Sequence, residues 1–86
     1  MARECEFDRA GTRLTRDERK ALRIADLREC TAERRIALRE KCLADIAFNA
    51  ECHATQLRNG MAVTQAQLAR NNASAVLTLE CLDAIA

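Results

Sequence analysis

The stretch that decides the fold is NGMAVTQAQ, residues 59–67, which has the features of a turn followed directly by the start of a helix. In Asn59-Gly60, the glycine can adopt the left-handed backbone conformation that ends a helix. Thr64 and Gln67 have the spacing of a capping box, in which the two side chains bond the free N–H groups of a first helical turn. These signals predict two helices joined by a turn over residues 59–63.

The composition supports an all-helical chain. The 86 residues include 17 Ala and 10 Leu but only two Val, four Ile and two Phe, with no Pro, Trp or Tyr. Alanine and leucine favour helices, whereas strands are built mainly from β-branched and aromatic residues. A chain of this length also has room for only one hydrophobic core. We therefore expect residues 1–86 to form a single all-α domain.

Upstream of the turn, the next strong start signal is a second capping box, formed by Thr15 and Glu18. No glycine or proline interrupts the chain from there to the turn, so the sequence predicts one long helix over residues 15–58. At 1.5 Å per residue, this helix would be about 66 Å long. Residues 1–14 show no clean period and are expected to be irregular, and the second helix should cover residues 64–85.

The unequal lengths of these two helices determine the expected assembly. In an antiparallel hairpin the shorter helix leaves residues 15–33 of the longer one without a partner. Leu22, Ile24 and Leu27 lie in this overhang, and exposing a fully buriable Leu or Ile forgoes roughly 1.5–3 kcal/mol each. The apolar overhang must therefore be covered.

Two arrangements would cover the overhang. The long helix can dock on a second copy, giving a homodimeric helical bundle, or it can break near Cys30-Thr31 and fold back as a monomeric three-helix bundle. Because no Gly or Pro marks a break, the sequence favours the long-helix antiparallel hairpin completed as a homodimer.

A 3.5-residue period selects an apolar stripe on each predicted helix, and we expect the two stripes to face each other. On the first helix the stripe comprises Leu22, Ala25, Ala32, Ile36, Leu43, Ile46, Ala50 and Leu57, and on the second helix it comprises Leu68, Ala75, Leu79 and Leu82.

A polar stripe accompanies the apolar one near the turn. Asn49, His53 and Gln56 recur at spacings of four and three residues, and the hairpin register places Asn49 beside Asn71-Asn72. We expect a hydrogen-bonded seam that sets the register of the two helices, as buried polar residues do in coiled coils. The alternative is a polar recognition face.

Few signals for chemistry are present. The five Cys and the single His lack the close spacings of metal sites, and neighbouring Cys52 and His53 diverge by about 100° on a helix. No glycine-rich phosphate loop occurs. The sequence therefore predicts no catalytic, metal-binding or cofactor-binding residues and a protein that is not an enzyme.

The expected location is the cytoplasm. The longest uncharged stretch, residues 59–69, is too short to cross a bilayer, and the first residues lack the apolar segment of a secretion signal. In the cytoplasm the cysteines should be reduced. The 14 basic and 13 acidic residues give a net charge of +1, which excludes attraction of the whole chain to nucleic acid or anionic membranes.

These observations predict a protein–protein interaction module that binds and occludes a surface of a larger partner, in the manner of a phage- or bacterium-encoded inhibitor of a host protein. Buried apolar and arginine side chains commonly dominate interface energies. The predicted contact residues are the apolar anchors Leu22, Ile24 and Leu27 with a charged rim of Arg16, Arg19, Arg23 and Arg28.

The alternative is a small nucleic-acid-binding regulator that uses the same arginine-rich segment. Phosphate contacts by these arginines would give steeply salt-dependent binding. Acidic residues such as Asp17, Glu18 and Asp26 are interleaved with the arginines and argue against this reading.

Overall fold

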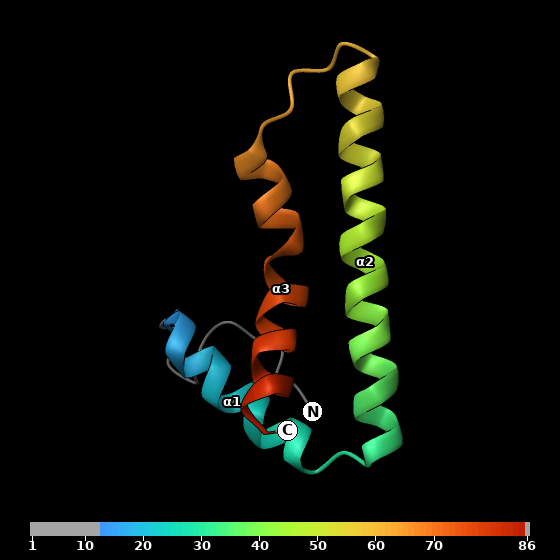
Figure 1. Cartoon of the computed structure of the whole chain (residues 1–86). Coiled ribbons are helices and arrows are strands. Elements are labelled where there is room, and N and C mark those ends of the chain that lie inside the picture. Colours follow the sequence, from blue (N-terminus) through green and yellow to red (C-terminus); the bar gives the residue numbers. More distant parts are fainter. Residues whose placement is uncertain (1–12, 86) are drawn as a thin grey trace.

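A computed structural model describes residues 13–85, which fold into three helices (Figure 1). They are α1 (Arg16–Arg28), α2 (Ala32–Arg58) and α3 (Gln65–Ala84). The prediction of an all-helical chain is confirmed. The predicted irregular segment over residues 1–14 lies outside the described residues except for its last two positions. No helix in residues 13–85 combines the length and hydrophobicity needed to cross a membrane.

The continuous helix predicted over residues 15–58 is wrong, because the chain breaks between α1 and α2. Thr31 adopts an extended conformation as the N-cap of α2, and its hydroxyl oxygen accepts a hydrogen bond from the backbone N–H of Arg34 at 3.1 Å. A threonine cap satisfies N–H groups that a continuous helix would have bonded internally. The break therefore forms without glycine or proline.

Hydrogen bonds from the Arg35 side chain also stabilise the break. The Arg35 guanidinium folds back and donates from Nη1 to the carbonyl oxygens of Leu27, at 3.1 Å, and Cys30, at 2.6 Å. These carbonyls lie at the end of α1, beyond its regular hydrogen bonds, and the Leu27 carbonyl also accepts from the backbone N–H of Cys30 at 3.1 Å. One side chain of α2 thus caps the C-terminus of α1.

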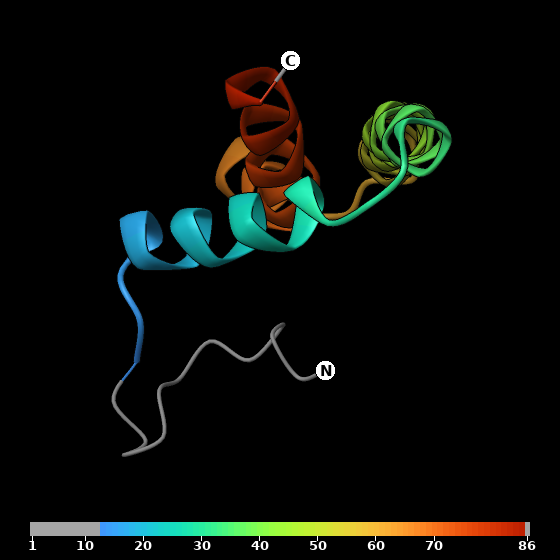
Figure 2. The same cartoon turned by 90° about the horizontal axis from the view of Figure 1, so that it is seen from below.

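α3 is the central element of the molecule. It runs antiparallel to α2, while α1 crosses the end of α3 near the C-terminus (Figures 1 and 2). The predicted turn is confirmed, with Gly60 at a φ of +80°, and so are the capping boxes at Thr15 and Thr64. Ile24 and Leu27, two of the three apolar residues of the overhang expected to need a second copy, instead pack in or against the core that α3 of the same chain forms.

The hydrophobic core lies where the three helices meet. Leu27 of α1 packs there with Leu77, Cys81 and Leu82 of α3. Partly buried apolar side chains surround this group, namely Ile24, Cys30, Leu38, Leu79 and Ile85. The C-terminal half of α3 is therefore covered on two sides by its own chain.

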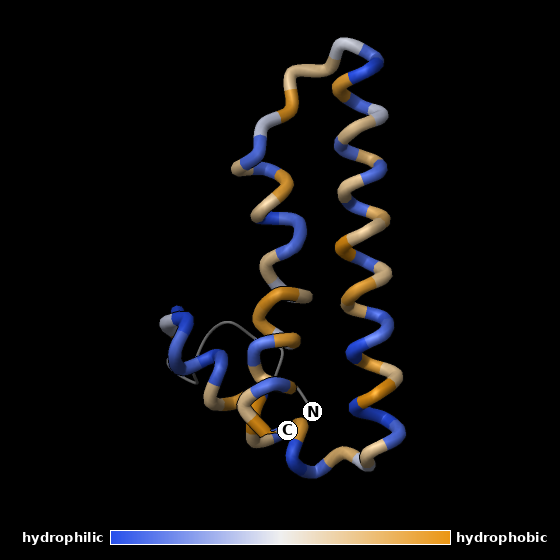
Figure 3. Tube along the Cα trace, viewed as in Figure 1, coloured by the Kyte–Doolittle hydropathy of each residue, from blue (hydrophilic) through white to orange (hydrophobic). Residues whose placement is uncertain are grey.

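The predicted pairing of apolar stripes is wrong for most of α2. Ile36, Leu43 and Leu57 are 61%, 53% and 51% exposed, and Ala50 is exposed as well. Cys42 and His53 are the buried residues of α2. Hydrophobic and hydrophilic positions accordingly alternate along the whole of α2 in Figure 3. The physical reason is that α2 turns toward α3 the side that carries Cys42 and His53, and Leu43 points about 100° away from Cys42 around the helix.

Candidate functional site

The predicted apolar anchors divide between the core and the surface. Leu27 is 4% exposed and belongs to the core, and Ile24 packs against that core. Leu22 is 44% exposed. Leu27 and Ile24 therefore hold α1 onto α3 of the same chain, and Leu22 is the most exposed of the three anchors.

Arg16 of the predicted rim is bonded to α3. Its Nη2 atom lies 2.9 Å from Oε2 of Glu80, and Lys20 Nζ lies 3.7 Å from the other carboxylate oxygen. The hydrogen bond from Arg16 holds the pKa of the Glu80 carboxyl below its ordinary value. This surface ion pair joins the start of α1 to the last turns of α3.

Arg23 and Arg19 also bond within the chain. Arg23 Nη1 donates to the hydroxyl of Thr78 at 2.9 Å and to the carbonyl of Ser74 at 3.1 Å, both on α3. Arg19 Nη1 donates to the carbonyl of Leu14 at 3.0 Å. The predicted rim is thus in large part a set of contacts that orient α1.

Arg28, the last member of the predicted rim, lies at the opposite end of α1. It lines a shallow hollow together with Arg35, Ala84 and Ile85. This hollow is formed between the end of α1 and the end of α3, so the structure does not gather Arg28 with Arg16 and Arg23 into one surface.

An exposed apolar surface runs along α2. We call it the α2 apolar face, and it consists of Ile36, Leu43, Ala47, Ala50, Ala54 and Leu57, all exposed. From Leu43 onward its members are separated by four, three, four and three residues. This alternation is the spacing by which one helix packs against another in a coiled coil.

Charged residues border the α2 apolar face on one side. Glu40, Glu51 and Arg58 are exposed, and a rotation of 100° per residue places them together along the edge of the face remote from α3. An apolar stripe with a charged edge is the arrangement found at helix–helix interfaces, where the apolar residues give affinity and the flanking charges select orientation.

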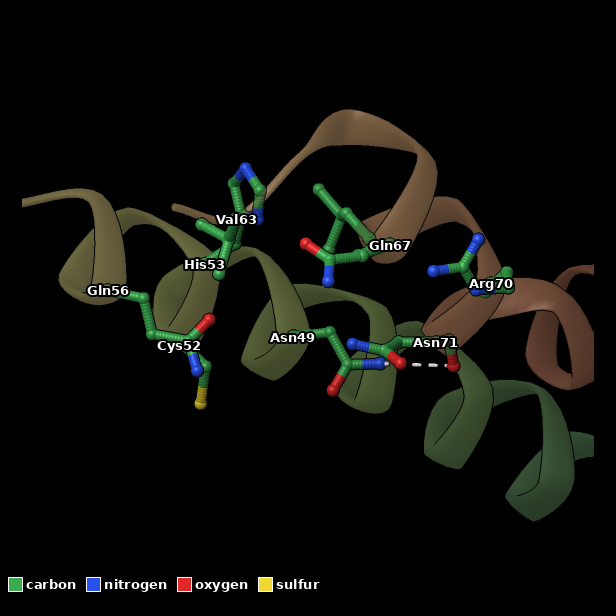
Figure 4. A pocket seen from close by; sticks show the side chains of 9 residues that line it. Asn49, Cys52, His53, Gln56, Val63, Gln67, Arg70 and Asn71 are labelled. Carbon is green, nitrogen blue, oxygen red and sulfur yellow. Dashed lines mark hydrogen bonds between the residues drawn. The ribbon is translucent and has the colours of Figure 1, made fainter. Parts of the chain in front are cut away.

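The side of α2 that faces α3 near the turn is polar. Asn49 Nδ2 donates to Oδ1 of Asn72 at 2.8 Å, which confirms the predicted contact. The same nitrogen approaches the carbonyl of Asn71 at 3.5 Å (Figure 4). This seam lies between the helices, so the polar side of α2 is turned inward and its apolar side outward.

A hollow of about 310 Å³ accompanies the seam (Figure 4). It is lined from both helices by Asn49, Cys52, His53, Gln56, Val63, Gln67, Leu68, Arg70 and Asn71. His53 is 9% exposed there. The lining contains polar amides and one arginine but no carboxylate, and within residues 13–85 no three His, Cys, Asp or Glu side chains are grouped closely enough to hold a metal ion.

Two cysteines are structural. Cys81 is fully buried, and its thiol donates to the carbonyl oxygen of Lys20 at 3.6 Å. Burial raises the pKa of both Cys81 and Cys42 above the ordinary value of a thiol. A thiol kept protonated in apolar surroundings is a poor nucleophile.

The exposure of the α2 apolar face was not predicted, although the spacing of its residues is present in the sequence. Leu43, Ala50 and Leu57 were assigned to the contact with the second helix because a hairpin offers an obvious cover for a stripe. Ala47 and Ala54 complete the alternating spacing of four and three residues from Leu43 to Leu57, and the polar seam residues lie on another side of α2.

Comparison with protein-family models, curated proteins and solved structures gives no match to this chain.

Proposed function

We propose that this chain is a non-enzymatic protein–protein interaction module whose binding face is the α2 apolar face. The observation that carries the proposal is the exposure of Ile36, Leu43 and Leu57 on one side of a long helix, in the spacing of a coiled coil. Contiguous apolar surface of this kind commonly marks an interaction site. An apolar helix of another polypeptide is the partner that such a face fits.

Energetic considerations support an apolar contact. Fully burying a Leu or Ile side chain contributes about 1.5–3 kcal/mol relative to leaving it exposed, and these three side chains each keep about half of that surface in water. Covering the face with a helix recovers this contribution. A cytoplasmic module of phage or bacterial origin could use the gain to occlude a surface of a larger protein.

Nucleic-acid binding receives less support. Arg16, Arg19 and Arg23 already donate hydrogen bonds to groups of their own chain. A phosphate would have to compete with these bonds, so the arginine-rich segment offers a weaker phosphate site than its composition suggests.

The test is capture of partner proteins by the immobilised chain and by two variants of equal charge, Leu43→Asp and Leu22→Asp. We expect Leu43→Asp to lose the partners that the parent chain retains at high salt, and Leu22→Asp to retain them. Circular dichroism checks that both variants remain helical. Retention of all partners by Leu43→Asp, or loss only in Leu22→Asp, would overturn the α2 apolar face as the binding surface.

A further inference from the structure

We propose that the occupant of the α2 apolar face is the same face of a second copy, packed antiparallel with its centre at Ala50. The inference rests on the proposed function, since it names the partner of the same face. It differs from the homodimer expected from the sequence, which was to cover Leu22, Ile24 and Leu27. Those residues lie on α1, and the new contact involves α2 alone.

The first argument is the near-palindromic order of the face. Leu43 and Leu57 lie seven residues before and after Ala50, while Ala47 and Ala54 lie three before and four after it. A twofold axis at Ala50 therefore places Leu43 of one copy against Leu57 of the other, and alanines against alanines. Twofold contacts use the same patch on both subunits, so a patch that matches its own reverse fits such a contact.

The second argument is the size of the central residues. Ala47, Ala50 and Ala54 have small side chains that let two helix axes approach to about 8 Å, the short end of the usual range. The larger Leu43 and Leu57 lie outside them and close both ends of the contact. This order fits a partner face with small side chains in the middle and large side chains at its ends, and the same face of a second copy has this order.

The third argument is charge. Glu40 lies ten residues before Ala50 and Arg58 lies eight residues after it, on the same edge of the face. In an antiparallel pair equal edges meet, so each Glu40 lies within about two residues, or 3 Å along the axis, of the partner's Arg58. The twofold axis generates two such pairs. Within one chain these residues are 18 positions, or about 27 Å, apart and cannot pair.

The geometry of the single chain leaves room for this contact. Cys42 is buried against the rest of the chain, and the neighbouring Leu43 points about 100° away from it around the helix. The ion pair of Arg39 with Asp83, at 2.8 Å, joins α2 to α3 along the edge of the face nearer α3. A helix docked on Leu43, Ala50 and Leu57 therefore lies beside α2 without displacing α3.

The test is a charge-reversal cycle read by sedimentation equilibrium of the full chain. At roughly 100 µM, well above a micromolar dissociation constant, the parent should sediment at twice its 9.6 kDa mass. Glu40→Arg and Arg58→Glu should each weaken dimerisation about tenfold, because two favourable edge pairs become repulsive. The double variant should return to within a few-fold of the parent, since its pairs are opposite in charge again.

A matched control and the remaining outcomes separate the two proposals. Phe48→Asp changes a residue on another side of α2 that is 64% exposed, against 53% for Leu43. It should leave the dimer intact, whereas Leu43→Asp should abolish it. A dimer that survives Leu43→Asp, or a double variant no better than the singles, overturns the inference. A monomeric parent that still captures other proteins through Leu43 overturns self-association alone, and a monomer without Leu43-dependent capture overturns the proposed function too.

Discussion

Arg23 Nη1 lies 2.9 Å from Oγ1 of Thr78, a hydroxyl that is nearly buried, with the residue 7% exposed. The bond joins the middle of α1 to α3 and lies next to the core that contains Leu27. A guanidinium that crosses between two helices at a buried acceptor orients α1 as well as holding it. This contact helps to hold α1 across α3, in place of an arrangement in which α1 and α2 form one straight helix.

Replacing Thr78 by Val should therefore destabilise the fold. The substitution keeps the shape of the side chain but removes the acceptor, and Arg23 retains the carbonyl of Ser74 at 3.1 Å and the more distant hydroxyl of the same residue. We expect a loss of about 1 kcal/mol in the free energy of unfolding, the usual contribution of one hydrogen bond. Urea denaturation measures it, with Ser74→Ala as the control, because that hydroxyl lies at 3.5 Å and contributes little. Equal stability of Thr78→Val and the parent would show that the bond does not matter.

Leu27→Ala and Leu22→Ala form a matched pair that separates core from surface. Leu27 is enclosed in the core, so its truncation should cost about 2–5 kcal/mol, enough to unfold much of a small domain. Leu22 is 44% exposed, and its truncation should cost less than about 1 kcal/mol. Thermal unfolding followed by circular dichroism compares them. Similar losses in the two variants would contradict the position of Leu27.

The extent to which the sequence predicted this fold depends on the range of each signal. The capping boxes at Thr15 and Thr64 and the glycine turn act over three or four residues, and all three were predictable. The break at Thr31 was predicted only as the alternative to a continuous helix, because it relies on Arg35 reaching back to the carbonyls of Leu27 and Cys30. Nothing in the local sequence distinguishes that arginine from its neighbours.

In the candidate site, too, the short-range contacts were predicted and the long-range ones were not. Asn49 was correctly placed beside Asn71-Asn72, because a short loop sets the register of the hairpin near its turn. Which side of α2 faces α3 was predicted wrongly, since the apolar stripe alone was assumed to drive the pairing. The rotation of α2 reflects the sum of the Asn49–Asn72 bond, the Arg39–Asp83 ion pair and the core, which are contacts between distant parts of the chain.

Glu80 should make the fold sensitive to acid. Arg16 holds the folded-state pKa of this carboxyl below its ordinary value of 4.5, so the contribution to stability is complete above that pH and is lost as the pH falls through the lowered pKa. Glu80→Gln should therefore show a flatter decline in melting temperature between about pH 5 and pH 2 than the parent. High salt should reduce the difference, because the pair is exposed to solvent. Parallel pH profiles for the two proteins would contradict this role of Arg16.

Cys81 and Cys42 should resist thiol reagents in the folded chain. Both are buried, and burial raises the pKa of each thiol, so the reactive thiolate forms only at higher pH. Cys52 lines the open hollow between α2 and α3 and serves as the internal control. Alkylation at pH 8 followed by mass spectrometry of peptides should modify Cys52 first and the two buried thiols after denaturant is added. Early modification of Cys81 would show that α1 leaves α3 readily.

Replacing Glu51 should strengthen the proposed dimer, whereas the substitutions of Glu40 and Arg58 should weaken it. Glu51 lies one residue from Ala50 on the charged edge, so the twofold axis brings the Glu51 carboxylates of both copies near each other. Their repulsion opposes the two Glu40–Arg58 pairs, and Glu51→Gln should strengthen dimerisation about two- to threefold at low salt. The gain should shrink as salt screens the charges. Glu33→Gln controls for net charge, because residue 33 lies beyond the end of the partner's α2. Weaker dimerisation of Glu51→Gln would show that the two Glu51 side chains do not face each other and that the register is not centred on Ala50.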